Sequence, residues 1–323
     1  MDEAGEPTYN STQLSIMVPL VSLFVLLVVL SYGWIIVTVA RTHSLHTASN
    51  CFLTSLAFSI VIMGLVGIPS VIFFTAVKAY TYPLIFILTW VMFFCIIGFF
   101  LNAVLLAADK WFKISRPFLY IRVVTRSNGT VCLSVIWATT LLGSLIIAIV
   151  RTATVYNLTR ASVNGAFAFM SVIIAYGIIM PSVTAITVLN IGILRIARQQ
   201  ARAILPNVQQ QQQPRVENDQ PPPQFAGQQR GMNTRSTRQF SIFFMSFPVT
   251  WFPTAIFLHA LYVSGSTRDN DWLVAALMIF SSIILFHTAF GTLILTLLQR
   301  EYRQILKKNT RIVLEKMHCI KRR

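Results

Sequence analysis

AYTYPLIFILTWVMFFCIIGFFLNAVLLAA, residues 79–108, contains thirty consecutive positions without Asp, Glu, Lys or Arg. One such charge at the centre of a bilayer costs about 2.5 to 3.5 kcal/mol on insertion scales, so a long charge-free stretch is typical of a membrane span. A helix needs roughly 20 apolar residues to cross about 30 Å of hydrocarbon. Seven charge-free stretches reach that length: 7–40, 42–77, 79–108, 127–150, 161–194, 239–267 and 272–299.

The composition also indicates a membrane protein. Of the 323 residues, 55% are hydrophobic and 11% are charged, whereas a soluble domain carries about 25% charged residues. The net charge of +16 does not indicate a nucleic-acid partner, because long apolar runs separate the bases. Lipid accepts only helices or closed barrels, and the apolar runs lack the alternation of barrel strands. The sequence therefore predicts an all-α membrane protein, a bundle of seven transmembrane helices.

The distribution of Lys and Arg predicts the orientation. One set of connecting segments, with the C-terminal tail, holds 22 of the 26 bases, and the other set holds four, including Arg151. Cytoplasmic segments carry the excess, so we expect an extracellular N-terminus and a cytoplasmic C-terminus in the plasma membrane. Acidic residues and no base precede the first span, which argues against a cleaved signal peptide. Asn10 and Asn157 are then extracellular glycosylation candidates or chance sequons, and the sequon at Asn128 is cytoplasmic.

Three regions follow from these boundaries. Residues 1–14 form an extracellular N-terminus, 15–298 form the bundle, and 299–323 form a short amphipathic eighth helix and a basic tail. That helix lies on anionic membrane lipids or is solvated. The Gln- and Pro-rich cytoplasmic loop 196–238 is predicted to be disordered, although its first residues, RIARQQARAIL, prolong the fifth helix. Cys319 is either a free thiol or palmitoylated.

The sequence shows no constellation of an enzyme. His259 and His287 are the only histidines within the predicted spans, and neither has an acidic residue or a second histidine one turn away. We therefore expect hydrogen-bonded histidines inside the bundle, and we predict no catalytic activity, no metal and no cofactor.

The charged stretch after residue 108, DKWFKISRPFLY, resembles the Asp-Arg-Tyr motif and the following Pro-Leu-x-Tyr of rhodopsin-like (class A) G-protein-coupled receptors. Asp109, Lys110 and Trp111 stand in the triad, and Pro117 opens the second part. Further matches in the family's order are Leu45, Thr47, Asn50, Leu56, Ala57, Gly64, Pro69, Trp137, Pro181 and, in FPVTWFP, Phe247, Trp251 and Pro253. The resemblance covers every span and implies a receptor that contacts a heterotrimeric G protein around Lys110.

The same resemblance assigns an activation switch. Pro253 interrupts a helix and lets its cytoplasmic end swing, and Phe247, Trp251 and Pro181 belong to that switch. Trp251 either responds to a ligand or is a packed aromatic beside the kink. In the resting state Asp109 holds Lys110.

Departures from the family mark a divergent member. The first-helix Asn of the family is replaced by Trp34 and the second-helix Asp by Ile60, and the seventh-helix Asn-Pro-x-x-Tyr begins instead with Gly291. The triad Arg is Lys110, which keeps the charge but loses the planar fork of donors, and the fifth-helix Tyr is Leu189. These changes remove the polar centre that binds sodium in the family.

Candidates for a ligand pocket, carried over by the same resemblance, are Met92, Phe93, Ile96, Thr254, Ala255, Leu258 and Ser281. Amine receptors have an Asp at the position of Met92, so this chain would offer an amine no counter-ion, and we expect a neutral or lipophilic ligand. The same residues could instead be ordinary bundle packing. Three functions compete: a receptor that signals to a G protein, a receptor-derived partner or trafficking subunit that does not, and a transporter or intramembrane enzyme. The absence of intramembrane carboxylates disfavours the third.

Overall fold

The computed structural model describes residues 11–67, 82–157, 172–211, 245–257, 259 and 260, and the single positions 283, 287 and 291. Several positions with sequence-based predictions lie outside the described residues: Asn10, Pro69, Leu258, Ser281, 212–238 and 299–323.

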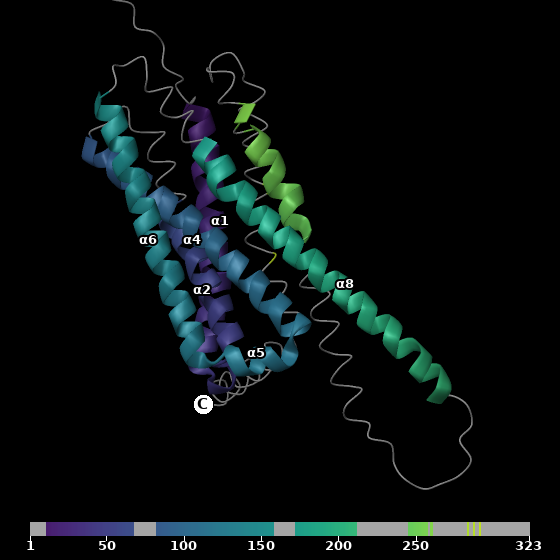
Figure 1. The fold of residues 1–323 in the computed structure, drawn as a ribbon. Helices are drawn as coiled ribbons and strands as arrows, with labels where there is room; N and C mark the ends of the chain where they lie inside the picture. The colour runs from purple at the N-terminus through teal and green to yellow at the C-terminus, as the bar shows by residue number, and fades with distance from the viewer. Residues whose placement is uncertain are drawn as a thin grey trace, which may run out of the picture.

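Five long helices account for most of the described chain (Figure 1). They are α1 (Ser11–Arg41), α2 (Ala48–Ile62), α4 (Tyr82–Ser115), α6 (Arg126–Asn157) and α8 (Met180–Gln211). Five segments are long and apolar enough to cross a membrane: Ser22–Arg41, Ala48–Gly67, Phe86–Ser115, Arg126–Ala153 and Ile173–Gln199. They coincide with the first five charge-free stretches. A helical segment at 245–257 falls in the sixth stretch.

Shorter elements join and extend these helices. The 3₁₀ turn η1 (His43–Leu45) leads to Thr47, whose side chain accepts a hydrogen bond from the Asn50 amide and caps α2. The helix α5 (Pro117–Val123) connects α4 to α6 and begins with Pro117, whose fixed φ and missing amide hydrogen suit a first helical position.

Two π-helical turns widen the bundle helices. η2 (Met63–Gly67) continues α2, and η4 (Ile173–Ile179) precedes α8. In η4 the Met180 amide donates to the Ala175 carbonyl, five residues back. Pro181 follows directly, and because its ring would clash with a carbonyl four residues earlier, a wider turn before it relieves the helix.

Charged residues do not end the helices where the sequence suggested. α4 runs through Asp109 and Lys110 to Ser115, so residues 109–126, which connect the third and fourth charge-free stretches, are largely helical. Arg151, counted above among the bases of an extracellular segment, lies inside α6 and is only 7% exposed. Both helices continue through these charged residues because each charged side chain has a polar partner on a neighbouring helix.

The fifth helix also extends further than its charge-free stretch. α8 reaches Gln211, as RIARQQARAIL predicts. Of the predicted loop 196–238, the structure describes residues 196–211, which are helical, and the disorder predicted for the rest stays a prediction. Ala, Arg and Gln are strong helix formers, which favours the continuation of the helix through this stretch.

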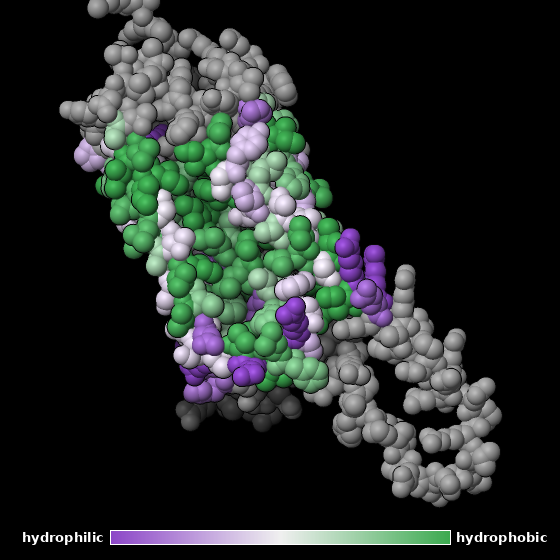
Figure 2. Space-filling model, viewed as in Figure 1, coloured by the Kyte–Doolittle hydropathy of each residue, from purple (hydrophilic) through white to green (hydrophobic). Residues whose placement is uncertain are grey.

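α4 is the central helix of the described part. It packs against α2, α6 and α8, and its Phe99, Phe100 and Ala103 belong to the core. By contrast, α6 turns Val131, Val135, Leu142, Ile146 and other apolar side chains outward. On the face drawn in Figure 2, hydrophobic residues predominate along the middle of the described bundle, as expected for contact with lipid.

A buried polar network joins α2, α4 and α6. The Ser55 hydroxyl donates to Asn102 Oδ1 at 2.6 Å, and Trp137 Nε1 donates to Ser55 Oγ at 3.0 Å. Asn102 Nδ2 donates to the Gly98 carbonyl at 2.8 Å. Because hydrocarbon offers no alternative partners, this network orients the three helices relative to one another.

Replacement of Ser55 by alanine should destabilise the bundle. Ser55→Ala leaves the Trp137 indole without its acceptor and Asn102 without its donor, at a cost of about 1 to 2 kcal/mol. Thermal unfolding in detergent measures the effect. Thr139→Ala is the matched control, because among the described residues this exposed residue donates its hydroxyl to the Val135 carbonyl of its own helix. Equal unfolding temperatures for the two variants would contradict the stabilising role of the network.

Candidate functional site

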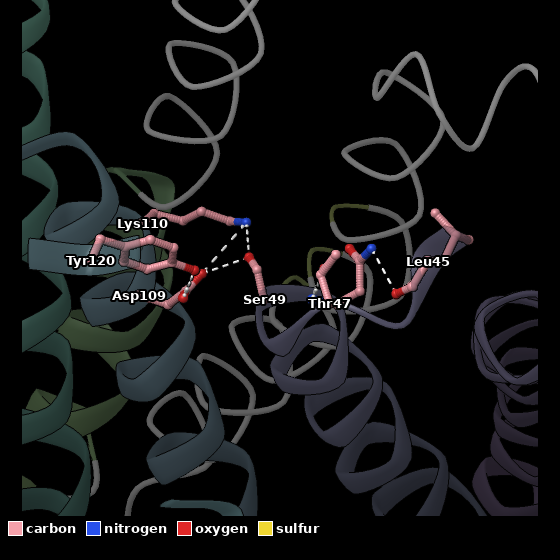
Figure 3. Close-up of polar contacts among 7 residues, drawn as sticks. Leu45, Thr47, Ser49, Asp109, Lys110 and Tyr120 are labelled. Carbon is pink, nitrogen blue, oxygen red and sulfur yellow. Dashed lines mark hydrogen bonds and ion pairs between the residues drawn. The ribbon is translucent and has the colours of Figure 1, made fainter. Parts of the chain in front are cut away.

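A buried acid lies near the end of α4, where α5 crosses the end of the bundle (Figure 3). The Asp109 side chain is fully buried and accepts two short hydrogen bonds. Ser49 Oγ of α2 donates to Asp109 Oδ2 at 2.6 Å, and Tyr120 Oη of α5 donates to Asp109 Oδ1 at 2.7 Å. One carboxylate therefore ties three helices together.

Lys110 lies beside this carboxylate but makes its shorter contact with a hydroxyl. Lys110 Nζ donates to Ser49 Oγ at 2.6 Å, whereas its distance to Asp109 Oδ2 is 3.7 Å. Ser49 thus donates to the acid and accepts from the base. We call Ser49, Asp109, Lys110 and Tyr120 the polar lock.

Tyr120 links the short helix α5 to the bundle. Its ring packs edge-on against Phe112 at 5.8 Å between centroids, and Lys113 Nζ lies 5.9 Å from its centroid. Burial and the hydrogen bond to the Asp109 carboxylate raise the pKa of Tyr120 above its ordinary value. The neutral phenol is therefore the form that the fold favours.

The other two coupling candidates lie near the lock but do not belong to it. Trp111 packs on α8, where a Cβ at Gly192 would lie 2.8 Å from Trp111 Nε1. The absence of a side chain at Gly192 permits this close approach of indole and backbone. Pro117 is exposed at the start of α5.

Two members of the lock were not among the predicted site residues. Tyr120 falls within the matched motif, but its bond to Asp109 could not be foreseen. Ser49 gives no signal of its own, because a serine near the start of an apolar helix is common and its partner is 60 positions away.

Aromatic side chains form a second cluster deeper in the bundle. Trp251 packs against Phe100 and Phe99 of α4, with ring centroids 4.7 Å and 5.8 Å apart. Phe247 stacks on Phe99 at 6.1 Å and meets the His287 ring edge-on at 5.2 Å. The structure thus brings together the predicted switch residues Phe247 and Trp251 and joins them to α4.

The two switch prolines, Pro253 and Pro181, are not part of the aromatic cluster. Pro253 is half-buried within the helical segment 245–257, and Pro181 is exposed on α8.

The pocket candidates divide by burial. Phe93, Thr254 and Ala255 are buried, whereas Met92 and Ile96 are half-buried and pack against the same core. The Thr254 hydroxyl donates to the Thr250 carbonyl of its own helix at 3.1 Å.

The buried cation and the histidines have polar or aromatic neighbours. Arg151 Nη1 donates to Thr89 Oγ1 of α4 at 2.6 Å. His287 Nε2 is hydrogen-bonded to Ser246 Oγ, which confirms the expectation for this histidine. His259 packs edge-on against Tyr176, at 5.4 Å between ring centroids. Within the described residues, no group of three or more metal-ligating side chains occurs.

Removal of the Tyr120 hydroxyl should destabilise the protein and change its response to alkali. Tyr120→Phe deprives the Asp109 carboxylate of one donor, at a cost of about 1 to 3 kcal/mol. Because the folded-state pKa of Tyr120 is raised above the unfolded value of about 10, its contribution to stability is complete below that pH and is lost as the pH rises further. Thermal unfolding between neutral pH and pH 11 should therefore show a steeper alkaline loss for the parent than for Tyr120→Phe.

Tyr176→Phe is the matched control, since that side chain is exposed and distant in sequence from the lock. We expect it to retain the alkaline loss of the parent. Parallel pH profiles for the parent and Tyr120→Phe would contradict the assignment.

The chain matches the family model for the 7 transmembrane receptor (rhodopsin family) over residues 33–291. The match begins within α1 and ends at the last described helical position, so it includes the polar lock and the aromatic cluster. It confirms the resemblance inferred from the motifs and the seven-helix architecture, of which five spans lie in the described residues. The protein accordingly crosses the membrane several times, and it belongs to the rhodopsin family of seven-transmembrane receptors.

Proposed function

We propose that this receptor couples a ligand to a heterotrimeric G protein through movement of its sixth helix. The observation that carries the proposal is the polar lock, in which Lys110 is held to α2 by the Ser49 hydroxyl (Figure 3). Lys110 stands at the centre of the triad by which this family contacts G proteins. Its amine carries three donors on a flexible stem, so once released from Ser49 it can donate to acceptors of the G protein, beside Trp111 and Pro117.

The aromatic cluster offers a mechanical link between ligand and lock. Trp251 and Phe247 of the sixth-helix segment pack on Phe99 and Phe100, which lie on the same helix as Asp109 and Lys110. A ligand that displaces Trp251 changes this packing, and the bend at Pro253 converts the change into movement of the helix end. Pro181 allows a corresponding adjustment in α8.

The ligand in this proposal is neutral or lipophilic. Phe93, Met92, Ile96 and Ala255 present apolar surface, and Thr254 supplies a hydroxyl. Leu258 and Ser281, outside the described residues, complete the proposed pocket. Such a pocket selects its ligand by shape and by few hydrogen bonds.

The orientation belongs to the proposal as well. The excess of Lys and Arg predicts that the end with the polar lock is cytoplasmic and that the N-terminus is extracellular, in the plasma membrane. Asn10 and Asn157 are then the glycosylation candidates, and Asn157 is the last residue of α6.

A second function is favoured by the centre of the bundle. Ile60, which replaces the family's acid, is 2% exposed within the hydrophobic core, and Gly291 is buried. A bundle that lacks the family's sodium-binding polar centre fits a receptor-derived partner or trafficking subunit that does not activate G proteins.

Nucleotide exchange on purified G proteins decides between the two. The receptor in nanodiscs, screened with lipophilic and peptide libraries, should accelerate exchange on one Gα class, and Lys110→Ala should reduce the rate roughly ten- to a hundredfold, as expected for one charge-assisted contact. Arg126→Ala, an exposed base outside the lock, is the control and should leave the rate unchanged. Trp251→Ala should lower the ligand response and spare the rate without ligand.

Unchanged responses in both Lys110→Ala and Trp251→Ala would refute the two assignments. No exchange by the parent on any G-protein class, with or without library compounds, would favour the non-signalling function.

An epitope tag tests the orientation on intact cells. A tag before Met1 should bind antibody without permeabilisation, and a tag after Arg323 should require it. Glycosidase treatment should increase the mobility of the parent chain and leave an Asn10→Gln, Asn157→Gln double variant unshifted. Antibody access to the C-terminal tag on intact cells would overturn the orientation.

A further inference from the structure

A buried cation lies near the end of α4 that is opposite the polar lock. Arg151 of α6 is 7% exposed, and its Nη1 donates to Thr89 Oγ1 of α4 at 2.6 Å. Thr89 is buried as well, and α4 and α6 lie side by side in Figure 1. Because the Thr89 hydroxyl is neutral, this bond orients the guanidinium without neutralising its charge.

The hydrogen-bonded pair lies on the face of α4 that carries the pocket candidates. Spacings of three, four and seven positions place side chains on one face of a helix, and these spacings separate Thr89 from Met92, Phe93 and Ile96. The three apolar residues belong to or pack against the same hydrophobic core as Ala255. From Thr89 to Ile96 the helix rises about 10 Å. A polar end and an apolar stretch therefore follow each other along one face.

Trp90, the residue after Thr89, adds a second donor at the same level. Its ring packs against Phe94 at 6.5 Å between centroids, and Phe94 packs against Trp137 of α6 at 5.8 Å, so Trp90 lies toward α6. Trp90 Nε1 is buried and has no hydrogen-bond partner in the part of the chain that the structure describes. An indole nitrogen can only donate. Trp90 and Arg151 thus present donors where α4 meets α6, and an anion can accept from both.

Charge restricts what such a site can bind. Asp109, the one acid among the described residues, lies near the other end of α4. An arginine within a membrane span is costly to bury, and an anion beside it offsets that cost. The planar guanidinium matches the two oxygens of a carboxylate. One guanidinium balances one negative charge, so a carboxylate fits better than a phosphate monoester, which carries about −1.5 to −2.

We propose that Arg151 binds the carboxylate of an amphipathic acid whose apolar part lies along Met92, Phe93 and Ile96. Thr89 orients the guanidinium, and Trp90 donates to the same carboxylate. The inference narrows the ligand of the proposed function to a lipophilic acid, and it rests on that function for the effect of the ligand on signalling. Binding itself requires only the fold.

Binding of tritiated decanoic acid to the full chain in nanodiscs tests the proposal. Scintillation proximity measures the Kd, and nanodiscs without protein give the background from lipid. Competition with methyl decanoate, decylamine and decyl phosphate shows which charge the site selects. Arg151→Gln removes the cation, and Arg151→Lys keeps the charge without the planar fork. Arg126→Gln is the matched control, because this exposed base lies at the other end of the same helix. Thermal unfolding confirms that each variant is folded.

We expect saturable binding to the parent that neither methyl decanoate nor decylamine displaces. Arg151→Gln should raise the Kd roughly ten- to a hundredfold, as expected for loss of a charged hydrogen-bond partner. Arg151→Lys should raise the Kd less, and Arg126→Gln should leave it unchanged.

Several results would overturn the proposal. They are no saturable binding to the parent, an equal Kd for the parent and Arg151→Gln, and stronger displacement by methyl decanoate or decyl phosphate than by decanoic acid. The competition uses the parent chain, so it decides even where Arg151→Gln does not fold. Binding that appears only after Asp269→Asn with Asp271→Asn would also overturn it, since those acids, outside the described residues, would then be the partners of Arg151.

Nucleotide exchange separates this inference from the proposed function. Decanoate binding that depends on Arg151, without exchange on any G protein, would support the site and refute the signalling role. Exchange that a neutral library compound stimulates, without saturable decanoate binding, would overturn the acidic ligand and leave the receptor function.

Discussion

Hydrocarbon offers no hydrogen-bond partners, and this constraint governs each polar contact in the described spans. Some hydroxyls in mid-span donate to a carbonyl of their own helix, as Thr140 does to Ile136 at 2.8 Å and Thr187 to Val183 at 2.6 Å, whereas the Ser55 hydroxyl donates to Asn102 of another helix. Asn102 and Arg151 instead form hydrogen bonds with side chains of neighbouring helices, and each bond fixes one helix against another. Because an unsatisfied polar group is costly in lipid, polar residues in these spans are few and their partners are specific.

The same constraint explains how far the sequence predicts the fold. Charges are excluded from the hydrocarbon, so the charge-free stretches locate the five described spans. They do not locate helix ends, since a helix continues into the headgroup layer, as α4 does past Asp109 and α8 past Arg195. Charge alone placed Arg151 outside the fourth span, although it lies inside α6. Its hydrogen-bond partner Thr89 belongs to another helix and cannot be inferred from the local sequence pattern.

The candidate site was predicted in part for a related reason. Motif order indicated Asp109, Lys110 and Trp251, and the structure joins the first two in one lock and places the third in an aromatic cluster. Ser49 escaped prediction because its importance comes from two contacts with α4 and not from its neighbours in sequence. Contacts of this kind, between residues far apart in sequence, depend on how the helices pack. The periodic pattern of residues along a single sequence does not reveal that packing.

The centre of the bundle shows how a member of this family can keep the fold without the family's polar relay. Ile60 is buried among apolar residues, and within the described residues His287 contacts both Ser246 and Phe247 of the sixth-helix segment. Aromatic rings that pack tightly have few alternative arrangements, so a shift of Trp251 must move Phe99 or Phe100 on α4. In the proposed function, packing between Trp251 and α4 takes the role of the polar chain, and the polar lock at the end of α4 is the charged site that a shift of Trp251 would reach.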